Sequence, residues 1–324
     1  MKKWILFTSI AFTLAFITAC GADEDENVSG EDVLDGYPDD DITIIWSSSP
    51  GSGGDIFLRS LAEPLEELLD VSVVVENREG ASGANAWNHI LNNTDPDGYT
   101  LLGTSATFIS SPVMNDLDIS HEDFKPVAQM FTEPQFLYTY ADSEFDDAEE
   151  LINHELENPE ELQWATATPG SKDNISISMI LEETGIDPHT VSFDSGTDAL
   201  TQIVGEHIDV ALGEYSALQG QIDSGTVKVL GALTEERYEH LPDVPTLTEL
   251  GWDVAPILSR GLVVHGDTPD EIVDYLAEVL EDTYEDEGFQ EVYEQQGLQP
   301  DYAPRDEFRS NLEEMDDFVR SLLD

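Results

Sequence analysis

Short apolar strand runs alternate with helical patterns along most of the chain, and this alternation restricts the folds open to it. The expected strands are Ile42–Trp46, Val71–Glu76, Thr100–Leu102, Gln135–Tyr140, Leu162–Ala167, Thr190–Phe193, Ile208–Leu212, Val227–Leu233 and Leu258–Val264. The expected helices include Asp55–Leu69, Ala84–Asn92, Ala148–Asn153, Asn174–Glu183, Thr197–Val204, Tyr215–Ser224 and Pro269–Tyr284. Strands that alternate with helices at short spacing predict parallel sheets, and 324 residues suffice for two α/β domains.

The first residues of the chain have the parts of an export signal. A basic start, Met1 to Lys3, precedes an apolar stretch from Trp4 to Phe16 and small residues before Cys20. The apolar run is short for a membrane span, so we expect residues 1–19 to be a cleaved secretory signal. Cys20 is the only cysteine and stands where bacterial lipoprotein signals place the lipidated residue, although an ordinary signal with an incidental cysteine has the same pattern. The acidic segment 20–37 predicts a disordered tether between the lipid and the folded domain.

Acidic residues dominate the composition and exclude some partners. The chain has 70 Asp and Glu against 12 Lys and Arg, which gives a net charge of -58. Such a surface repels nucleic acid and anionic membranes, so neither is an expected partner. Molar salt shortens the Debye length to roughly 3 Å and would relieve the self-repulsion. An acidic halophilic protein is therefore one hypothesis, and a soluble exported protein with a solvated acidic surface is the other.

A glycine-rich loop, SPGSGGD, follows the first expected strand and leads into the first expected helix. It is not a dinucleotide fingerprint, because the third glycine position is Ile56, and it lacks the Gly-Lys-Ser/Thr ending of a P-loop. Its backbone N–H groups and hydroxyls, with the helix dipole, suit a negative ligand, and Asp55 is the expected N-cap. Taken alone, a plain tight turn explains the same residues. The candidate ligand-binding residues here are Ser49, Gly51, Ser52, Gly53, Gly54 and Asp55.

Three further loops repeat this chemistry after later strands. They contain Thr104 and Ser105, then Thr168, Gly170, Ser171 and Lys172, and finally Ser195, Gly196 and Thr197. Ligands of open α/β sheets bind at the carboxyl ends of the strands. Loops of small hydroxyl and glycine residues at these ends therefore predict one ligand crevice.

Motifs for catalysis are not recognisable in the sequence. There is no G-x-S-x-G elbow, and the seven histidines show no H-E-x-x-H or paired-ligand spacing. Carboxylate pairs are so frequent in this composition that they say little about acid–base catalysis. We therefore expect no enzyme activity, no cofactor and no metal. An exported hydrolase or transferase is the alternative, and it would need a nucleophile with a base in hydrogen-bond reach.

Six blocks of the sequence, in order, resemble one family. They are PGSGGDIFLR, VVVENREGASGANA, PDGYTLLGTS, LQWATATPGS, VSFDSGTDALTQIVGEHIDVAL and LPDVPTLTELG. From about residue 42 to its end, the chain is similar to the substrate-binding proteins of tripartite tricarboxylate transporters, the TctC or Bug family. The resemblance implies an α/β, two-lobed periplasmic-binding-protein fold of the second type, with a ligand crevice between hinged lobes. We expect lobe 1 to comprise residues 38–140 and 252–324 and lobe 2 to comprise residues 141–251, with hinges near Tyr140–Asp142 and Leu250–Asp253.

The resemblance also implies a function. Such a protein captures a small carboxylate outside the cytoplasm, here from a lipid anchor, and delivers it to a two-component membrane permease. A monomer is the usual state. Family members hold the ligand carboxylate mostly through main-chain N–H groups, hydroxyls and water, which agrees with the loops above and requires few basic residues. A receptor that presents its ligand to a membrane kinase would have the same lobes and is the second interpretation.

Some positions depart from the family pattern and bear on the ligand. Phe193 replaces a Tyr whose hydroxyl could meet the ligand, and Glu79 stands where Pro is frequent. Gly213 stands where many members carry an Asp that meets a ligand ammonium. This favours an acid without an amine, although Glu214 next to it could substitute. Lys172 stands where small hydroxyl residues are usual. It either binds a second carboxylate of the ligand or faces solvent.

Overall fold

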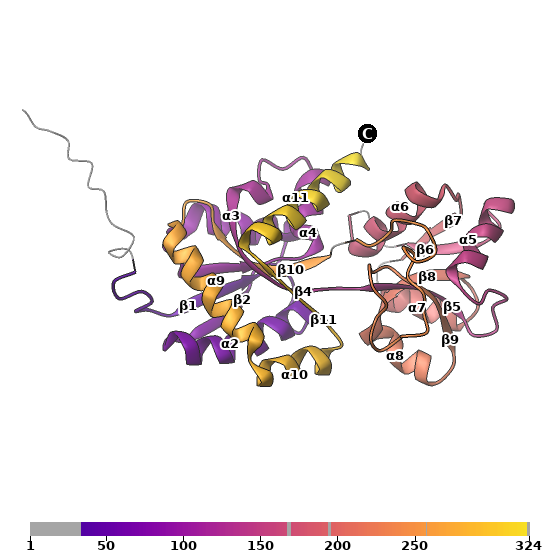
Figure 1. Cartoon of the computed structure of the whole chain (residues 1–324). Coiled ribbons are helices and arrows are strands. Elements are labelled where there is room, and N and C mark those ends of the chain that lie inside the picture. The colour runs from indigo at the N-terminus through magenta and orange to yellow at the C-terminus, as the bar shows by residue number, and fades with distance from the viewer. Residues whose placement is uncertain (1–33, 167–169, 194–195, 257, 323–324) are drawn as a thin grey trace, which may run out of the picture.

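The computed structural model describes residues 34–166, 170–193, 196–256 and 258–322, which form two α/β lobes (Figure 1). The predicted signal, residues 1–19, and the predicted lipidation site Cys20 lie outside these ranges. Among the helices within them, none combines the length and apolar character needed to cross a bilayer. The prediction of a two-lobed α/β fold is confirmed.

The first lobe is built on a six-stranded sheet with the order β11-β4-β10-β3-β1-β2. Its strands are β1 (Ile42–Trp46), β2 (Val73–Asn77), β3 (Thr100–Gly103), β4 (Phe124–Thr132), β10 (Ser259–His265) and β11 (Gln299–Pro304). Its helices are α2 (Gly53–Leu69), α3 (Ala84–Asn93), α4 (Ala106–Met114), α9 (Asp270–Glu285), α10 (Glu287–Gln296) and α11 (Arg305–Ser321), with 3-10 turns at Ala81–Gly83 and His121–Asp123.

The second lobe is built on a five-stranded sheet with the order β7-β6-β8-β5-β9. Its strands are β5 (Gln135–Tyr140), β6 (Gln163–Thr166), β7 (His189–Ser192), β8 (Val210–Glu214) and β9 (Val227–Ala232). Its helices are α5 (Ala148–Glu157), α6 (Lys172–Thr184), α7 (Gly196–Val204) and α8 (Tyr215–Asp223). Every strand that the sequence predicts is present, and β4 and β11 are additional.

Both sheets are mixed, so the prediction of parallel sheets is only partly right. β1 is parallel to β2 and β3, and β6 is parallel to β7 and β8. β10 runs antiparallel to β3 and β4, and β5 runs antiparallel to β8 and β9. The reason is the connection between the lobes. β4 leads out of the first lobe and β10 returns to it, so the two strands run in opposite directions.

The crossings lie elsewhere than the sequence predicts. Strand β5 pairs with β8 and β9, so residues 135–140 belong to the second lobe and the outward crossing is at Glu133–Pro134. The return crossing follows Val254, which packs in the core of the second lobe, and precedes β10. The predicted hinge at Tyr140–Asp142 is therefore wrong. The apolar pattern of residues 135–140 predicts a strand but does not indicate to which lobe the strand belongs.

The end of the predicted tether also belongs to the first lobe. Leu34 and Tyr37 pack against its core, and the Tyr37 hydroxyl donates to the carbonyl of Gly98 at 2.9 Å. The tether prediction is therefore too long at its carboxyl end.

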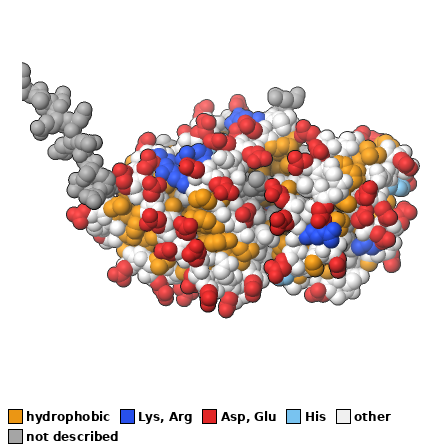
Figure 2. Space-filling model, viewed as in Figure 1, with side chains coloured by type: hydrophobic (Ala, Val, Ile, Leu, Met, Phe, Trp, Pro, Cys, Tyr) orange, Lys and Arg blue, Asp and Glu red, His pale blue; other side chains and the backbone are white. Residues whose placement is uncertain are grey.

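The first-lobe sheet is covered by helices on both faces. Along β1, Ile44 packs in the cluster under α2 and α9, whereas Ile45 packs in the cluster under α3, α4 and α11. Successive side chains of a strand point to opposite faces, so a strand such as β1, which is apolar at four of its five positions, fits a sheet buried on both sides. Acidic side chains cover much of the visible surface of both lobes (Figure 2).

Candidate functional site

The loop between β1 and α2 is tied down by a buried aspartate. Asp55 is 2% exposed, and its carboxylate accepts hydrogen bonds from the Gly51 N–H at 2.8 Å and Arg59 Nε at 3.0 Å. Asn77 Nδ2 donates to the same carboxylate at 2.9 Å and to the carbonyl of Ser48 at 3.0 Å. The hydrogen bonds from Arg59 lower the pKa of Asp55 to about 2. The prediction that Asp55 caps α2 is wrong, because the N-cap is Ser52 and Asp55 holds the loop from beneath.

Ser52 stands at the start of α2 with its hydroxyl supported by a tryptophan. Trp46 Nε1 donates to Ser52 Oγ at 2.9 Å, so the hydroxyl acts there as an acceptor and can still donate to a ligand. A Cβ at Gly54 would lie 2.2 Å from Cζ2 of Trp46, which means that only glycine lets the indole pack beneath the loop. The glycine-rich sequence is therefore needed for this arrangement of Trp46 and Ser52.

Several helices begin at the crevice without a side-chain cap. α2, α4 and α8 have the N-caps Ser52, Ser105 and Glu214, and none of these side chains accepts a hydrogen bond from a backbone N–H of the first turn. α3 differs, because it continues from the 3-10 turn Ala81–Gly83 and its first N–H donates to the carbonyl of Ala81. Away from the crevice, α5 begins at Asp147, whose side chain accepts from the N–H of Glu150, whereas α9 and α11 also begin without a side-chain cap. The first N–H groups of a helix have no partner within it and carry a partial positive charge. Converging uncapped starts therefore suit an anion.

The loop before α3 forms another part of the wall and has an unusual backbone. Ala81 and Ser82 have φ values of 49° and 52°, between Gly80 at 114° and Gly83 at 104°. Left-handed backbone at two residues with side chains is costly and is concentrated at functional sites. Ser82 and the glycines of this loop are not among the site residues predicted from the sequence, although Gly80 and Gly83 on either side of Ala81 and Ser82 were a usable signal.

These loops enclose a cavity of about 550 Å³ between the lobes. Its lining residues are Trp46, Ser47, Ser48, Ser52, Gly53, Gly54, Glu79, Gly80, Ser82, Gly83, Ser105, Thr107, Glu133, Lys172, Glu214 and Arg260. Five of the predicted site residues are therefore in its wall, namely Ser52, Gly53, Gly54, Ser105 and Lys172.

A cluster of four charged side chains closes the floor of the cavity. Glu133, on the outward crossing, pairs with Arg260 of β10 and lies 3.7 Å from Lys172 Nζ of α6. Lys172 also pairs with Glu214 at the end of β8. Burial opposes ionisation of Glu133, but the charges of Arg260 and Lys172 outweigh it and hold its pKa below the ordinary value. Arg260 and Glu133 are not among the site residues predicted from the sequence, although an arginine within the apolar strand β10 was a usable signal of a functional side chain.

Other predicted residues lie near the cavity and have structural partners. Ser49 and Gly51 belong to the first loop without lining the cavity, and the Gly51 N–H is bonded to Asp55. Thr104 is buried, and its Oγ1 accepts from the Gly261 N–H at 2.9 Å, which joins β3 to β10. Ser171 caps α6 by accepting from the Asn174 N–H at 3.2 Å.

Of the fourth predicted loop, the described residue Gly196 lies close to the first turn of α6. A Cβ at Gly196 would be 3.8 Å from Oδ2 of Asp173 on α6. Gly196 and Thr197 begin α7 and are not in the cavity wall. Thr168 and Ser195 lie outside the described residues.

Gly170 joins the two lobes beside the cavity. Its carbonyl accepts a hydrogen bond of 2.5 Å from Ser110 Oγ of α4, and a Cβ there would lie 2.5 Å from Sδ of Met114. Ile175 of α6 is fully buried against the same side of the first lobe. Gly170 therefore makes a lobe-to-lobe contact and is not among the residues that line the cavity.

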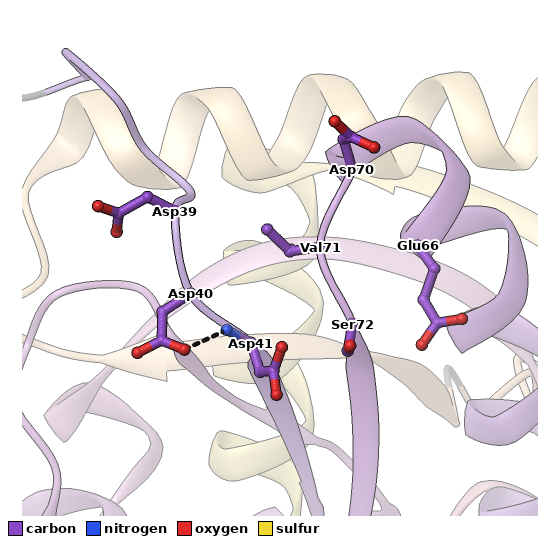
Figure 3. Close-up of a pocket in the computed structure, with 7 residues that line it drawn as sticks. All are labelled: Asp39, Asp40, Asp41, Glu66, Asp70, Val71 and Ser72. Atoms are coloured by element: carbon purple, nitrogen blue, oxygen red, sulfur yellow. Dashed lines mark hydrogen bonds between the residues drawn. The ribbon is translucent and has the colours of Figure 1, made fainter.

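A second cavity, of about 480 Å³, lies near the amino ends of β1 and β2 and has a different character (Figure 3). Its wall contains the carboxylates of Asp39, Asp40, Asp41, Glu66 and Asp70. The carboxylates in Figure 3 point in different directions, and no group of His, Cys, Asp or Glu within the described ranges is arranged to hold a metal ion. Repulsion from these carboxylates makes this cavity unsuitable for an anion.

Comparison with known proteins gives a consistent family. The model of the family described as tripartite tricarboxylate transporter family receptor, TctC, matches residues 57–315. A UPF0065 protein of Pseudomonas sp. (strain P51) is 26% identical over 223 residues, which are 67% of this chain and 65% of that protein. Protein BugT of Bordetella pertussis is 29% identical over 225 residues, 67% of this chain and 68% of that protein.

Solved structures have the same fold. A TctC solute-binding protein from Polaromonas, without ligand, has a TM-score of 0.81 and 25% identity and covers 89% of this chain and 99% of its own. MatC from Rhodopseudomonas palustris with bound malate has a TM-score of 0.67 and 22% identity, covering 87% of this chain and 100% of its own. An R. palustris protein with adipate has a TM-score of 0.68 and 21% identity, covering 87% of this chain and 95% of its own.

Proposed function

This chain belongs to the tripartite tricarboxylate transporter receptor family, TctC, and on that premise we propose that it captures a small organic acid outside the cytoplasm for a membrane permease of the same transporter type. The protein is a binding protein and not an enzyme in this proposal. Cys20 carries the lipid that anchors it, and the acidic residues after Cys20 space the lobes from the membrane.

The observation that carries the proposal is the convergence of uncapped helix starts on one cavity. α2 and α4 begin there from the first lobe, and the hydroxyls of Ser52 and Ser105 stand at these starts. Each such interaction with an anion is worth about 0.3–1 kcal/mol at a surface and more when it is partly buried. In this proposal, an anion is held without a free basic residue, as so acidic a chain requires.

The ligand class follows from cavity size and from the fold relatives. A cavity of about 550 Å³ is within the usual range for small-molecule sites. Malate and adipate, bound to the two R. palustris proteins, are small dicarboxylates. By analogy, we expect a di- or tricarboxylate or a similar organic acid here.

A thermal-shift screen of residues 34–324 in high salt tests the proposal. The set contains malate, succinate, adipate, citrate, monocarboxylates, amino acids and uncharged sugars. A ligand at a hundred times its Kd stabilises the native state by about 2.7 kcal/mol, so a carboxylate should raise the unfolding midpoint by several degrees. A shift with sugars alone, or with no acid, would contradict the proposal.

Two variants at Ser52 locate the site. Ser52→Asp keeps a good N-cap, so the fold should be retained, but it places a carboxylate where the ligand's carboxylate binds. The shift with acids should disappear in Ser52→Asp and persist in Ser52→Thr, which keeps the hydroxyl. An unchanged shift in Ser52→Asp would place the site elsewhere.

A further inference from the structure

In the charged cluster at the cavity floor, carboxylates of the protein already occupy the cations that an anionic ligand would need. The cations in the cavity wall are Lys172 and Arg260, and each is already paired with a carboxylate of the wall. We infer that Glu214 occupies Lys172 in the empty protein and is displaced by the second carboxylate of a diacid, so that the pair selects dicarboxylates over monocarboxylates. This inference rests on the proposed function.

Glu133 is not the carboxylate that leaves. It is shared by Arg260 and Lys172, and its side chain is 14% exposed. Arg260 Nη1 also donates to the carbonyl of Thr104 at 3.4 Å, which fixes the guanidinium against β3. Breaking this arrangement would leave a buried charge without a partner, which is strongly unfavourable. Arg260 therefore stays neutralised and is not free for a ligand.

Glu214 is placed to leave. Its side chain is 28% exposed, and within the described ranges its Oε1 pairs with Lys172 Nζ and accepts no hydrogen bond from the backbone. It is the N-cap residue of α8, but its side chain makes no cap bond to that helix. Swinging out to solvent therefore costs Glu214 its ion pair with Lys172 and no hydrogen bond to the backbone.

The two lobes contribute different anion-binding groups to the cavity wall. The starts of α2 and α4 belong to the first lobe, and Lys172 belongs to the second lobe. A monocarboxylate occupies the helix starts and leaves the Lys172–Glu214 pair intact. A diacid that spans the cavity exchanges one carboxylate for another on Lys172, so the charge around this lysine is unchanged and both lobes are bridged.

Isothermal titration of the full mature chain at fixed NaCl tests the inference. The ligands are matched pairs in which a methyl group replaces one carboxylate, succinate with butyrate and adipate with hexanoate, together with aspartate. The variants are Glu214→Gln, Lys172→Met and, as a control, Glu182→Gln, which removes one charge from the exposed side of α6. Unfolding midpoints of the variants establish that each is folded.

The expected results differ between the variants. Glu214→Gln should tighten binding of the preferred diacid about tenfold and change monoacid binding less than twofold. Lys172→Met should weaken the diacid at least tenfold and abolish the difference between diacid and monoacid. Glu182→Gln should bind both like the unmodified chain.

Other outcomes overturn the inference, and they separate it from the proposed function. Equal tightening of monoacid and diacid in Glu214→Gln would reflect only net charge, and weaker diacid binding would make Glu214 a ligand contact. Aspartate binding that is lost in Glu214→Gln would assign Glu214 to an ammonium group. In these cases acid capture itself would stand, whereas failure of the unmodified chain to bind any acid would refute both.

Discussion

The packing of Trp46 beneath the first loop predicts that two adjacent glycines respond oppositely to alanine. Gly53 and Gly54 are both in the first turn of α2, and both line the cavity. A Cβ at Gly54 would meet Cζ2 and Cη2 of Trp46 at 2.2 and 2.5 Å, whereas a Cβ at Gly53 would meet nothing within 4 Å. The two substitutions are otherwise chemically identical.

The magnitudes follow from these distances. In Gly54→Ala the indole must move by roughly an ångström, which costs about 1–3 kcal/mol as overpacking, and its hydrogen bond to Ser52 adds about 1 kcal/mol if it is lost. Replacing glycine by alanine within a helix gains up to about 1 kcal/mol. Gly53→Ala should thus be neutral or slightly stabilising, and Gly54→Ala should lie about 2–4 kcal/mol below it.

Urea unfolding in 1 M NaCl, followed by far-UV circular dichroism, measures the difference. The first lobe should unfold at a lower urea concentration in Gly54→Ala than in Gly53→Ala, with an unchanged slope. The near-UV signal should also change in Gly54→Ala alone, because Trp46 is 5% exposed in the native loop and must leave its position. The reasoning is refuted if the two variants unfold at the same urea concentration.

Three further predictions concern charge and the lobe contact. Because the folded-state pKa of Asp55 is lowered to about 2, its stabilisation is present above pH 4 and is lost as the pH falls towards 2. Asp55→Asn should therefore cost about 2 kcal/mol at pH 7 and less at pH 3 by urea unfolding, and a constant difference would contradict this. Gly170→Ala should weaken acid binding about fivefold or more by calorimetry, because its Cβ meets Met114 Sδ at 2.5 Å. As a control, Gly185→Ala should bind the acid like the unmodified chain, because Gly185 has a similar φ of 71° and a Cβ there would meet nothing within 4 Å. Equal acid affinities of Gly170→Ala and Gly185→Ala would exclude a role of the lobe contact. Raising NaCl from 0.1 to 2 M should raise the unfolding temperature of a chain with a net charge of -58, and no rise would count against the halophilic hypothesis.

Elements with a strong local pattern could be predicted from the sequence. β1 and β5 have the predicted bounds, and α2 begins two residues before the predicted start because Asp55 resembles an N-cap. β4 was missed because Lys125, Pro126 and Gln129 interrupt its apolar run. β4 pairs with β10 through a ladder that contains register shifts, and this pairing cannot be predicted from the sequence of β4 alone.

The structure places only some of the predicted site residues in the wall of one cavity. The hydroxyl and glycine loops after β1 and β3 do face one cavity through Ser52 and Ser105. Gly170 and Thr104 have the same local signature and make structural contacts instead. A small residue after a strand indicates that the backbone turns there. It does not indicate whether its polar group points into the cavity or towards another part of the protein.

The sequence by itself determined the alternation of strands and helices, the glycine-rich loops and the family, because each depends on residues that are close along the chain. Only the tertiary structure decided which charges meet. Glu133 and Arg260 are 127 residues apart, and they pair because β4 and β10 lie side by side as the chain leaves and re-enters the first lobe. Lys172 reaches them from the other lobe. Such contacts depend on strand order and on the relative position of the lobes, and no local pattern of residues encodes either.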